Sequence, residues 1–361
     1  MSYQKNNINL FVLDITLKGG IERFSINLAN SLSKYGYTVK IYSLHKSNKG
    51  PLYLLSNNVK IEYINNYKKP STQKYKLTTL YSCYKLKKMN AILNKNCTNI
   101  STHPITTILL RVLGFNMSNL IASEHSSYNS HGKFVCLLRK WAYSKVKKIV
   151  TQTKSGYNSF KNINLDSTLI YNSTVNFNDL DQWKLNSSND FICITIARIE
   201  PVKQLEIFLH IAREIKERKI NIKFKIIGDG SEKEKLKALS INLGLEDIVE
   251  FYPATSDVYK YYKNASLYII TSKSESFSMT MTEAMSYSIP VISNKSLIGP
   301  SEVIIHNING FLCKDNDVNQ FSDYIQKVYE SNNLISLRKN ALNTSKNFHE
   351  DEIIKKWIEI L

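Results

Sequence analysis

Alternating apolar and polar stretches divide the chain into strand-like and helix-like segments. In the first half the pattern predicts strands at residues 8–15, 38–44, 59–64, 119–122, 148–152 and 168–171, and helices at residues 21–35, 74–93, 133–147 and 154–161. Gly36 follows the first of these helices, a position where glycine commonly ends a helix. Strands that alternate with helices are typical of a parallel sheet with helices on both faces.

The same alternation begins again after a polar, acidic segment at residues 176–189, which we expect to be a linker. Strands are predicted at residues 191–196, 223–227, 248–251, 267–270 and 290–293, and helices at residues 204–219 and 351–361. Another helix is predicted to start at Ser231 with a capping box to Glu234 and to end at Gly244. We therefore expect an α/β protein of two Rossmann-like, doubly wound parallel-sheet domains, at residues 1–178 and 190–345, with an interdomain cleft.

The positive charge of the chain is concentrated in its first half. The formal net charge is +18 over 361 residues, yet residues 1–178 hold 25 Lys/Arg against 5 Asp/Glu, and residues 179–361 hold 23 against 25. This asymmetry predicts an anionic partner for the first domain, either a phospholipid membrane, a nucleic acid or an anionic substrate. An AT-rich genome would explain a high lysine content but not the asymmetry.

Other features of the composition limit the location of the protein. No run of about 18 apolar residues is long enough to cross a membrane, and the polar N-terminus does not resemble a signal peptide. The five cysteines show no CxxC spacing, which favours reduced thiols in the cytoplasm over a disulfide framework.

Two glutamates, Glu275 and Glu283, are the most informative residues in the sequence. Glu275 follows the predicted strand at residues 267–270 on a loop, and Glu283 lies about one turn into a helix that begins near Ser278. Open α/β sheets bind ligands in the crevice beyond the carboxyl ends of their strands. The free N–H groups at a helix start suit a phosphate there, and carboxylates suit hydroxyls. A sugar attached to a phosphate would satisfy both.

Further candidate residues follow other predicted strands. Arg198 and Lys203 place a guanidinium and an ammonium in the same crevice, a good match for a diphosphate, although solvated charges at a helix start are the alternative. Gly19 and Gly20 allow close approach of a ligand at the start of the first helix, but their spacing is not that of a nicotinamide-binding loop. His125 also faces the crevice, unless its role is structural.

The sequence predicts no metal site. The histidines lack the paired spacing of zinc ligands. Asp179 and Asp181 form a DxD pair, which can hold a metal bound to a nucleotide diphosphate, but they fall in the predicted linker. We therefore expect no metal and no cofactor.

Taken together, these residues resemble the retaining glycosyltransferase family 4, which has the GT-B fold, in its bacterial cell-surface polysaccharide type. The resemblance covers nearly the whole chain. Its matching motifs are Glu275-x7-Glu283, Arg198-x4-Lys203, Gly228-Asp229-Gly230 and Asn309-Gly310-Phe311-Leu312. Serine replaces the usual glycine of the family at Ser276, Ser278 and Ser288, and Ala197 replaces the glycine before the arginine.

The resemblance implies a role for each matched residue. Arg198 and Lys203 would neutralise the diphosphate of a nucleotide sugar, helped by amides at Phe277, Ser278 and Met279 and at Gly19 and Gly20. Glu283 would hold the ribose and Glu275 the transferred sugar, while His125 would lie near the reacting face of that sugar. Residues 346–361 would form a helix that crosses back to the first domain.

The implied activity is retaining, metal-independent transfer of a hexose or N-acetylhexosamine from a nucleotide diphosphate sugar. The resemblance favours UDP as the nucleotide, with guanine left open as the base. The acceptor would be a lipid-linked or cell-surface polysaccharide of the capsule, O-antigen or lipopolysaccharide type, carried on polyprenyl diphosphate.

The basic, aromatic segments at residues 68–95 and 133–143 predict peripheral binding to the anionic inner face of the plasma membrane and no nucleic-acid partner. The alternatives for the activity are another enzyme on the same fold, such as a sugar-nucleotide epimerase or a phosphorylase, and a non-catalytic nucleotide-sugar binder.

Overall fold

The computed structural model describes residues 7–66, 81–82, 84–89, 97–125, 132–174, 190–255, 257–331 and 333–361. The chain divides into two compact units: unit 1 contains residues 1–173 and Asp351–Leu361, and unit 2 contains Thr174–Glu350. The predicted linker at residues 176–189, the pair Asp179 and Asp181, and most of the predicted helix at residues 74–93 lie outside the described residues.

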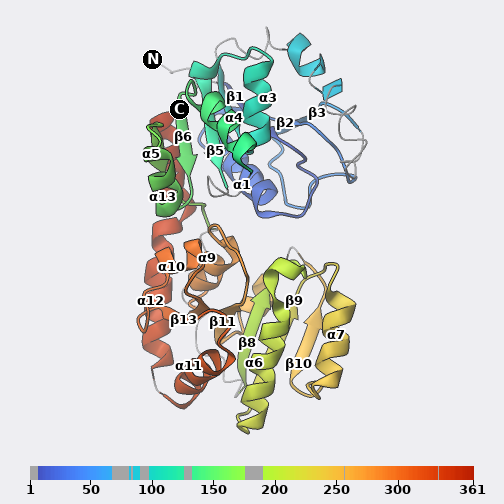
Figure 1. The fold of residues 1–361 in the computed structure, drawn as a ribbon, viewed down its shortest axis with the longest axis vertical. Helices are drawn as coiled ribbons and strands as arrows, with labels where there is room; N and C mark the ends of the chain where they lie inside the picture. The colour runs from blue at the N-terminus through green and yellow to red at the C-terminus, as the bar shows by residue number, and fades with distance from the viewer. Residues whose placement is uncertain are drawn as a thin grey trace. The chain divides into compact units, whose positions relative to one another are not determined.

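Within the described residues, unit 1 is built on a seven-stranded parallel sheet with the order β3-β2-β1-β4-β5-β6-β7 (Figure 1). The strands are β1 (Asn7–Val12), β2 (Thr38–Ser43), β3 (Lys60–Tyr63), β4 (Cys97–Ser101), β5 (Leu120–Glu124), β6 (Lys148–Thr151) and β7 (Ser167–Leu169). The helices are α1 (Gly20–Lys34), α3 (Pro104–Val112), α4 (Lys133–Tyr143), α5 (Lys154–Lys161) and α13 (Glu350–Ile360), with the short η1 (Met117–Asn119).

The described part of unit 2 holds a six-stranded parallel sheet with the order β10-β9-β8-β11-β12-β13. Its strands are β8 (Phe191–Ile196), β9 (Ile222–Ile227), β10 (Val249–Tyr252), β11 (Leu267–Ile270), β12 (Val291–Asn294) and β13 (Gly310–Cys313). Its helices are η4 (Pro201–Lys203), α6 (Leu205–Glu217), α7 (Lys233–Asn242), α8 (Tyr259–Tyr262), α9 (Met279–Ser286), α10 (Ile298–Val303), α11 (Val318–Glu330), α12 (Leu334–Ser345) and η5 (Lys346–Phe348). The predicted α/β class, with two doubly wound parallel sheets, is confirmed.

The C-terminal helix α13 packs into the core of unit 1. Ile353, Ile354 and Trp357 are buried in the same apolar cluster as residues of β1 and α1. The Lys147 ammonium donates a 2.8 Å hydrogen bond to the backbone oxygen of Leu361. The apolar face of this helix therefore finds its partner in the first sheet rather than in neighbouring sequence.

Strand β4 is absent from the strands that the sequence predicts. Its side chains are mostly polar, although all five of its residues are buried. The Asn9 side-chain amide on β1 donates to Asn99 Oδ1 on β4 at 3.0 Å. Because its buried side chains are mostly polar, the strand carries no apolar run that would reveal it in the sequence.

The predicted capping box at the start of α7 is wrong. The helix begins at Lys233, and neither Ser231 nor Glu234 caps it. The Ser231 hydroxyl instead donates to Glu200 Oε2 at 2.8 Å, and Glu234 pairs with Lys237 on the surface. The long-range bond to Glu200 holds the β9–α7 turn against the turn that follows β8.

Candidate functional site

The candidate site of unit 2 lies where its strand order reverses. Strands β8 and β11 pair side by side, and the chain continues from β8 toward β9 on one side and from β11 toward β12 on the other. The turns that follow β8 and β11 therefore diverge from adjacent strand ends, which is the crevice where open α/β sheets bind ligands. Arg198 and Lys203 lie in the first turn, and Glu275 lies in the second.

Lys203 and Glu275 form an ion pair across these two turns. Both side chains are largely buried, and the Ser272 hydroxyl donates a further 3.0 Å hydrogen bond to Glu275 Oε1. The backbones are joined as well, because Lys273 N donates to Val202 O at 2.8 Å and Thr271 Oγ1 donates to Lys203 O at 3.0 Å. The structure thus brings together the residues predicted for the diphosphate and for the sugar.

Arg198 has an exposed side chain that makes no hydrogen bond or ion pair with any described residue. Its backbone is held tightly by the Gly228-Asp229-Gly230 turn. A Cβ at Gly228 would lie 1.9 Å from Ala197 O, and one at Gly230 would lie 2.1 Å from Ile199 O. Glycine is needed at both positions because the two backbone segments pack together. This packing fixes the position of the Arg198 backbone, from which the guanidinium extends.

The start of α9 presents backbone amides beside this ion pair. Phe277 and Met279 bury their side chains in the protein, and Ser278 between them has φ +63°, in the left-handed region. Gly299 on α10 packs against this turn so closely that a Cβ there would lie 2.4 Å from Ser276 O. Met281 N already donates to Ser278 O at 3.1 Å, whereas Met279 and Thr280, at the start of the helix, can offer their N–H groups to an anion.

Glu283 lies on α9 and is buried. The Tyr262 hydroxyl donates to its Oε2 at 3.4 Å, and the Tyr262 ring stacks on Tyr287 with centroids 5.0 Å apart. The two glutamates therefore occupy different surroundings: Glu275 faces a cation, and Glu283 faces a phenol hydroxyl.

In unit 1 the glycine turn lies at the start of α1, where Gly19 is the residue before the helix. Neither glycine has a positive φ in the left-handed region. A Cβ at Gly20 would meet nothing within 4 Å, and one at Gly19 would meet the Glu22 side chain. The fold of unit 1 itself therefore gives no packing reason for glycine at residue 20, in contrast to Gly228 and Gly230.

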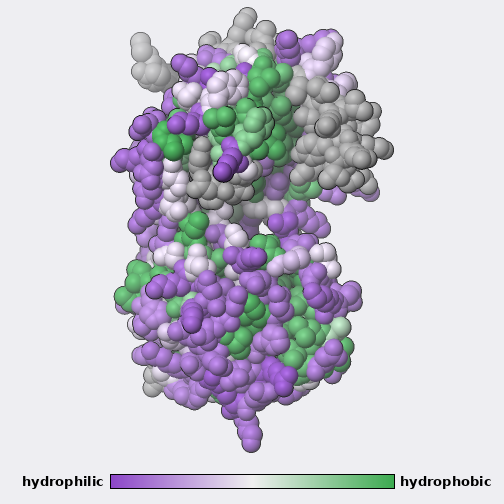
Figure 2. All heavy atoms as spheres, in the orientation of Figure 1, coloured by the Kyte–Doolittle hydropathy of each residue, from purple (hydrophilic) through white to green (hydrophobic). Residues whose placement is uncertain are grey.

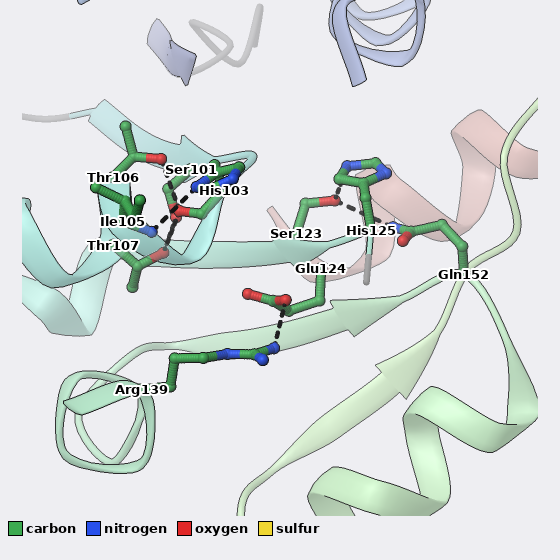
Figure 3. A network of polar contacts seen from close by, with 10 residues as sticks. All are labelled: Ser101, His103, Ile105, Thr106, Thr107, Ser123, Glu124, His125, Arg139 and Gln152. Atoms are coloured by element: carbon green, nitrogen blue, oxygen red, sulfur yellow. Dashed lines mark hydrogen bonds and ion pairs between the residues drawn. The ribbon is translucent and has the colours of Figure 1, made fainter. Parts of the chain in front are cut away.

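His125 follows β5 and is contacted by Ser123, which Gln152 holds in turn, and by Phe24. Its Nε2 lies 3.2 Å from Ser123 Oγ, and the Gln152 amide donates to the same oxygen at 3.2 Å (Figure 3). The Phe24 ring of α1 meets the imidazole edge-on, with centroids 4.4 Å apart. Burial lowers the pKa of His125 to about 3, with a smaller contribution from His103, so the imidazole is neutral at physiological pH.

Glu124, next to His125, points to the opposite side of β5 and forms a 2.7 Å ion pair with Arg139 on α4 (Figure 3). Both side chains are buried. Burial raises the pKa of Glu124, and the guanidinium opposes that rise. This pair attaches α4 to the sheet and fixes which face of the helix is turned inward.

The sequence does not single out Ser123, Gln152, Phe24, Ser272 or Tyr262, which contact the predicted residues. One of them was detectable in principle, because alternate residues of a strand share a face and Ser123 is two positions before His125. The others come from elements that only the strand order and helix packing bring close.

Residues 177–348 match the family model described as "Glycosyl transferases group 1". Over 98% of its length the chain is 27% identical to an uncharacterized glycosyltransferase of Haemophilus influenzae, covering 99% of that protein. It is 26% identical to the amylovoran biosynthesis glycosyltransferase AmsD of Erwinia amylovora, again over 98% of this chain and 99% of that protein. These findings support a GT-B glycosyltransferase.

The solved structures agree with this fold. The structure of HepE from Anabaena in complex with UDP and glucose superimposes with a TM-score of 0.76 at 16% identity, covering 98% of each chain. The two-sheet architecture of the chain is therefore the GT-B fold. Among the described residues, no helix is long and apolar enough to cross a membrane.

Proposed function

We propose that the protein is a retaining glycosyltransferase that transfers a hexose or N-acetylhexosamine from a UDP-sugar to a polysaccharide acceptor. The observation that carries this proposal is the Lys203–Glu275 pair at the β8/β11 switch point, beside the exposed Arg198 and the amides at the start of α9. Cations and amides suit a diphosphate, and carboxylates suit sugar and ribose hydroxyls. The same crevice thus offers groups for each part of a nucleotide sugar.

The ion pair matters for the proposed mechanism. Lys203 pairs with Glu275, and the Ser272 hydroxyl donates to the same carboxylate. A diphosphate would compete for the ammonium, and Glu275 would then accept from hydroxyls of the transferred sugar. Arg198 can bind the phosphate without breaking any described ion pair. Glu283, steadied by Tyr262, would accept from the ribose, and we propose that His125, Gly19 and Gly20 also contact the donor.

The reaction transfers one glycosyl group and one proton. The bond between the anomeric carbon and the β-phosphate oxygen breaks, and a bond from that carbon to the acceptor hydroxyl oxygen forms on the same face. The hydroxyl proton passes to the leaving phosphate oxygen, which yields UDP and the extended glycan. Negative charge develops on the diphosphate as the bond breaks, so positioned cations lower the barrier. Arg198 and Lys203 would supply that charge without a metal.

The relatives make a cell-surface polysaccharide the favoured product. The name of the Erwinia relative refers to biosynthesis of amylovoran, and the Anabaena structure was solved with UDP and glucose. We propose an acceptor of the capsule, O-antigen or lipopolysaccharide type, carried on polyprenyl diphosphate at the inner face of the plasma membrane.

A donor panel tests the reaction. Release of nucleoside diphosphate would be measured with UDP- and GDP-sugars, with and without chelator, and the anomeric configuration of the product would be read by NMR. We expect release from a UDP-sugar, unchanged by chelator, with retention. Loss of activity with chelator would refute the metal-independent mechanism. A free sugar phosphate as product would indicate a phosphorylase. Conversion of one nucleotide sugar into another would indicate an epimerase, and binding without turnover would indicate a non-catalytic binder.

Unit 1 offers a surface suited to the proposed membrane partner. Phe134, Leu137 and Trp141 repeat along one face of α4 and are 72%, 65% and 43% exposed, while Arg139 points inward to Glu124. Figure 2 shows the hydrophobic residues gathered over α3 and α4. We call Phe134, Leu137 and Trp141 the α4 ridge.

The charges around the α4 ridge favour an anionic bilayer as its partner. Lys133, Lys140 and Lys145 accompany the ridge and are exposed. Residues 1–178 as a whole hold 25 Lys/Arg against 5 Asp/Glu. Apolar side chains flanked by lysines bind anionic lipid through burial and charge together.

Flotation with vesicles tests this partner. We expect the protein to float with phosphatidylglycerol vesicles at low salt and the F134S/L137S double variant to remain in solution. A V202S variant, which changes an exposed apolar residue of unit 2, serves as the control. Equal flotation of the wild type and the ridge variant would refute the α4 ridge as the membrane contact. If the wild type instead self-associates and the ridge variant does not, the partner of the ridge is a second copy of the protein.

A further inference from the structure

The hydrogen bonds around Ser123 constrain where His125 carries its proton. Ser123 Oγ lies between two groups: the Gln152 amide donates to it, and His125 Nε2 lies 3.2 Å away (Figure 3). A serine hydroxyl has one hydrogen to donate and two lone pairs to accept with. Ser123 is buried, so a hydroxyl hydrogen without an acceptor would cost free energy.

Only one assignment gives the Ser123 hydroxyl hydrogen an acceptor as the structure orients these groups. If Gln152 donates to Ser123 and Ser123 donates to His125 Nε2, both hydrogens that lie between these three side chains have an acceptor. If instead His125 Nε2–H donated to Ser123, the hydroxyl hydrogen would have no acceptor among the described residues. A neutral imidazole has one N–H, so Nε2 accepts and the proton lies on Nδ1.

The orientation of the Gln152 amide supports the same direction. Its Nε2 faces Ser123, and its Oε1 is buried with no hydrogen-bond partner among the described residues. Turning the amide over would place the NH2 group, with two hydrogens, where the structure provides no acceptor. Leaving the single acceptor Gln152 Oε1 without a partner costs less free energy than leaving the two hydrogens of the turned NH2 group without acceptors.

The Phe24 ring adds a steric restraint. It lies edge-on to the imidazole with centroids 4.4 Å apart, and its other neighbour is Trp357 of α13 at 6.0 Å. The imidazole is therefore held by a hydrogen bond on one atom and by an aromatic ring at its side. His125 Nδ1 has no hydrogen-bond partner in the described part of the chain.

We propose that Ser123 and Gln152 are positioning residues that keep the proton of His125 on Nδ1, so that His125 donates a hydrogen bond to an oxygen of the donor substrate and does not act as a base. Its only basic nitrogen is occupied by Ser123. The acceptor proton must then leave by another route, as it does when the leaving phosphate takes it. The role of His125 toward the donor rests on the proposed function. The position of its proton does not.

Nitrogen-15 NMR of the full chain labelled with [15N]histidine tests the proton position directly. Two-bond correlations distinguish Nδ1–H from Nε2–H imidazoles, and the His125 signals are assigned by their loss in an H125N variant. We expect the Nδ1–H pattern in the wild type and in S123T, and a shift toward Nε2–H in S123A. An Nε2–H pattern in the wild type would overturn the proposal, whatever the activity.

Kinetics separates positioning from folding. We expect S123A to lower kcat by about tenfold with little change in KM for the donor, and S123T to restore it. S101A removes another buried, hydrogen-bonded hydroxyl of unit 1 and should keep full activity. Unchanged kcat in S123A would refute the positioning role. Full turnover in H125N would refute the proposed function of His125 and leave the proton assignment standing on the NMR result.

Discussion

The two units place candidate ligand-binding groups at comparable sheet ends by different physical means. In unit 2 the groups are charged: Lys203 and Glu275 neutralise each other, and glycines are crowded by backbone. In unit 1 the groups are neutral: His125 is held by Ser123, and Gly20 faces open space. Packing explains the crowded glycines of unit 2, and the ion pair explains its two charges. Neither explains the uncrowded Gly20 or the His125 Nδ1 without a described partner, so these two groups point to a ligand.

The largest effect should come from breaking the charged pair. We expect K203A to lower kcat by about 100- to 1000-fold, because the developing charge on the diphosphate loses a positioned cation. K273A, an exposed lysine on the partner turn, should change kcat by less than about threefold. Steady-state kinetics with saturating donor makes the comparison. Full turnover in K203A would refute the site assignment in unit 2, whereas equal losses in both variants would indicate a general charge effect.

The two kinds of glycine should respond in opposite ways to a methyl group. G230A should destabilise unit 2 by about 3 kcal/mol or more, because its Cβ would lie 2.1 Å from Ile199 O. G20A should keep the free energy of unfolding within about 0.5 kcal/mol, because nothing lies within 4 Å of its Cβ, while lowering kcat/KM by about tenfold. Urea unfolding and kinetics measure the two effects. A stable, fully active G20A would remove the argument that this turn approaches a ligand.

The neutral character of His125 predicts a pH dependence of stability. Its folded-state pKa of about 3 lies below the unfolded value, so between these values the unfolded chain binds more protons. Stability is therefore lost as pH falls below about 6.5, by at most about 2 kcal/mol at pH 5. Urea unfolding of the wild type and H125N at pH 7.5 and 5.0 isolates this term. The opposing contribution of Glu124 is present in both proteins and cancels. Identical pH dependence in the two would contradict a depressed pKa.

Much of the fold is predictable from the sequence because apolar patterning reports burial. Strand β11 is an apolar run, and α6 carries its apolar residues at helical spacing. Strand β4 is not predictable in this way, since most of its buried side chains are polar, among them Asn99, whose Oδ1 accepts from Asn9 of β1. Helix α11 lies outside the predicted elements although its buried residues Phe321, Ile325 and Val328 have helical spacing.

The candidate site divides along the same line. The sequence indicates that Lys203 and Glu275 follow strand ends, but their contact joins residues 72 positions apart and depends on β8 pairing with β11. Gln152 reaches Ser123 only because β6 pairs with β5. Candidate side chains at strand ends can therefore be identified from the sequence. The residues that neutralise or orient those side chains cannot, because they depend on the strand order.

The smallest effects concern two serines of unit 2, at positions where the resemblance to glycosyltransferase family 4 leads us to expect glycine. Ser278 and Ser288 have φ of +63° and +59°. Ser288 N bonds to Met285 O and Ile289 N to Ala284 O, the Schellman arrangement that favours glycine after a helix. We expect S288G to raise the free energy of unfolding by about 1 kcal/mol, because glycine relieves the left-handed strain.

The matched variant S286G, within α9, should lower the free energy of unfolding by about 0.5–1 kcal/mol, because glycine there loses backbone entropy without relieving strain. S278G should raise the free energy of unfolding as S288G does. The activity of S278G then shows whether the strained turn at residue 278 has a function. A more stable but slower S278G would mean that the strained turn positions the amides at the start of α9. A more stable and equally active one would mean that this serine is merely tolerated. Destabilisation by S288G would contradict the strain argument at both positions.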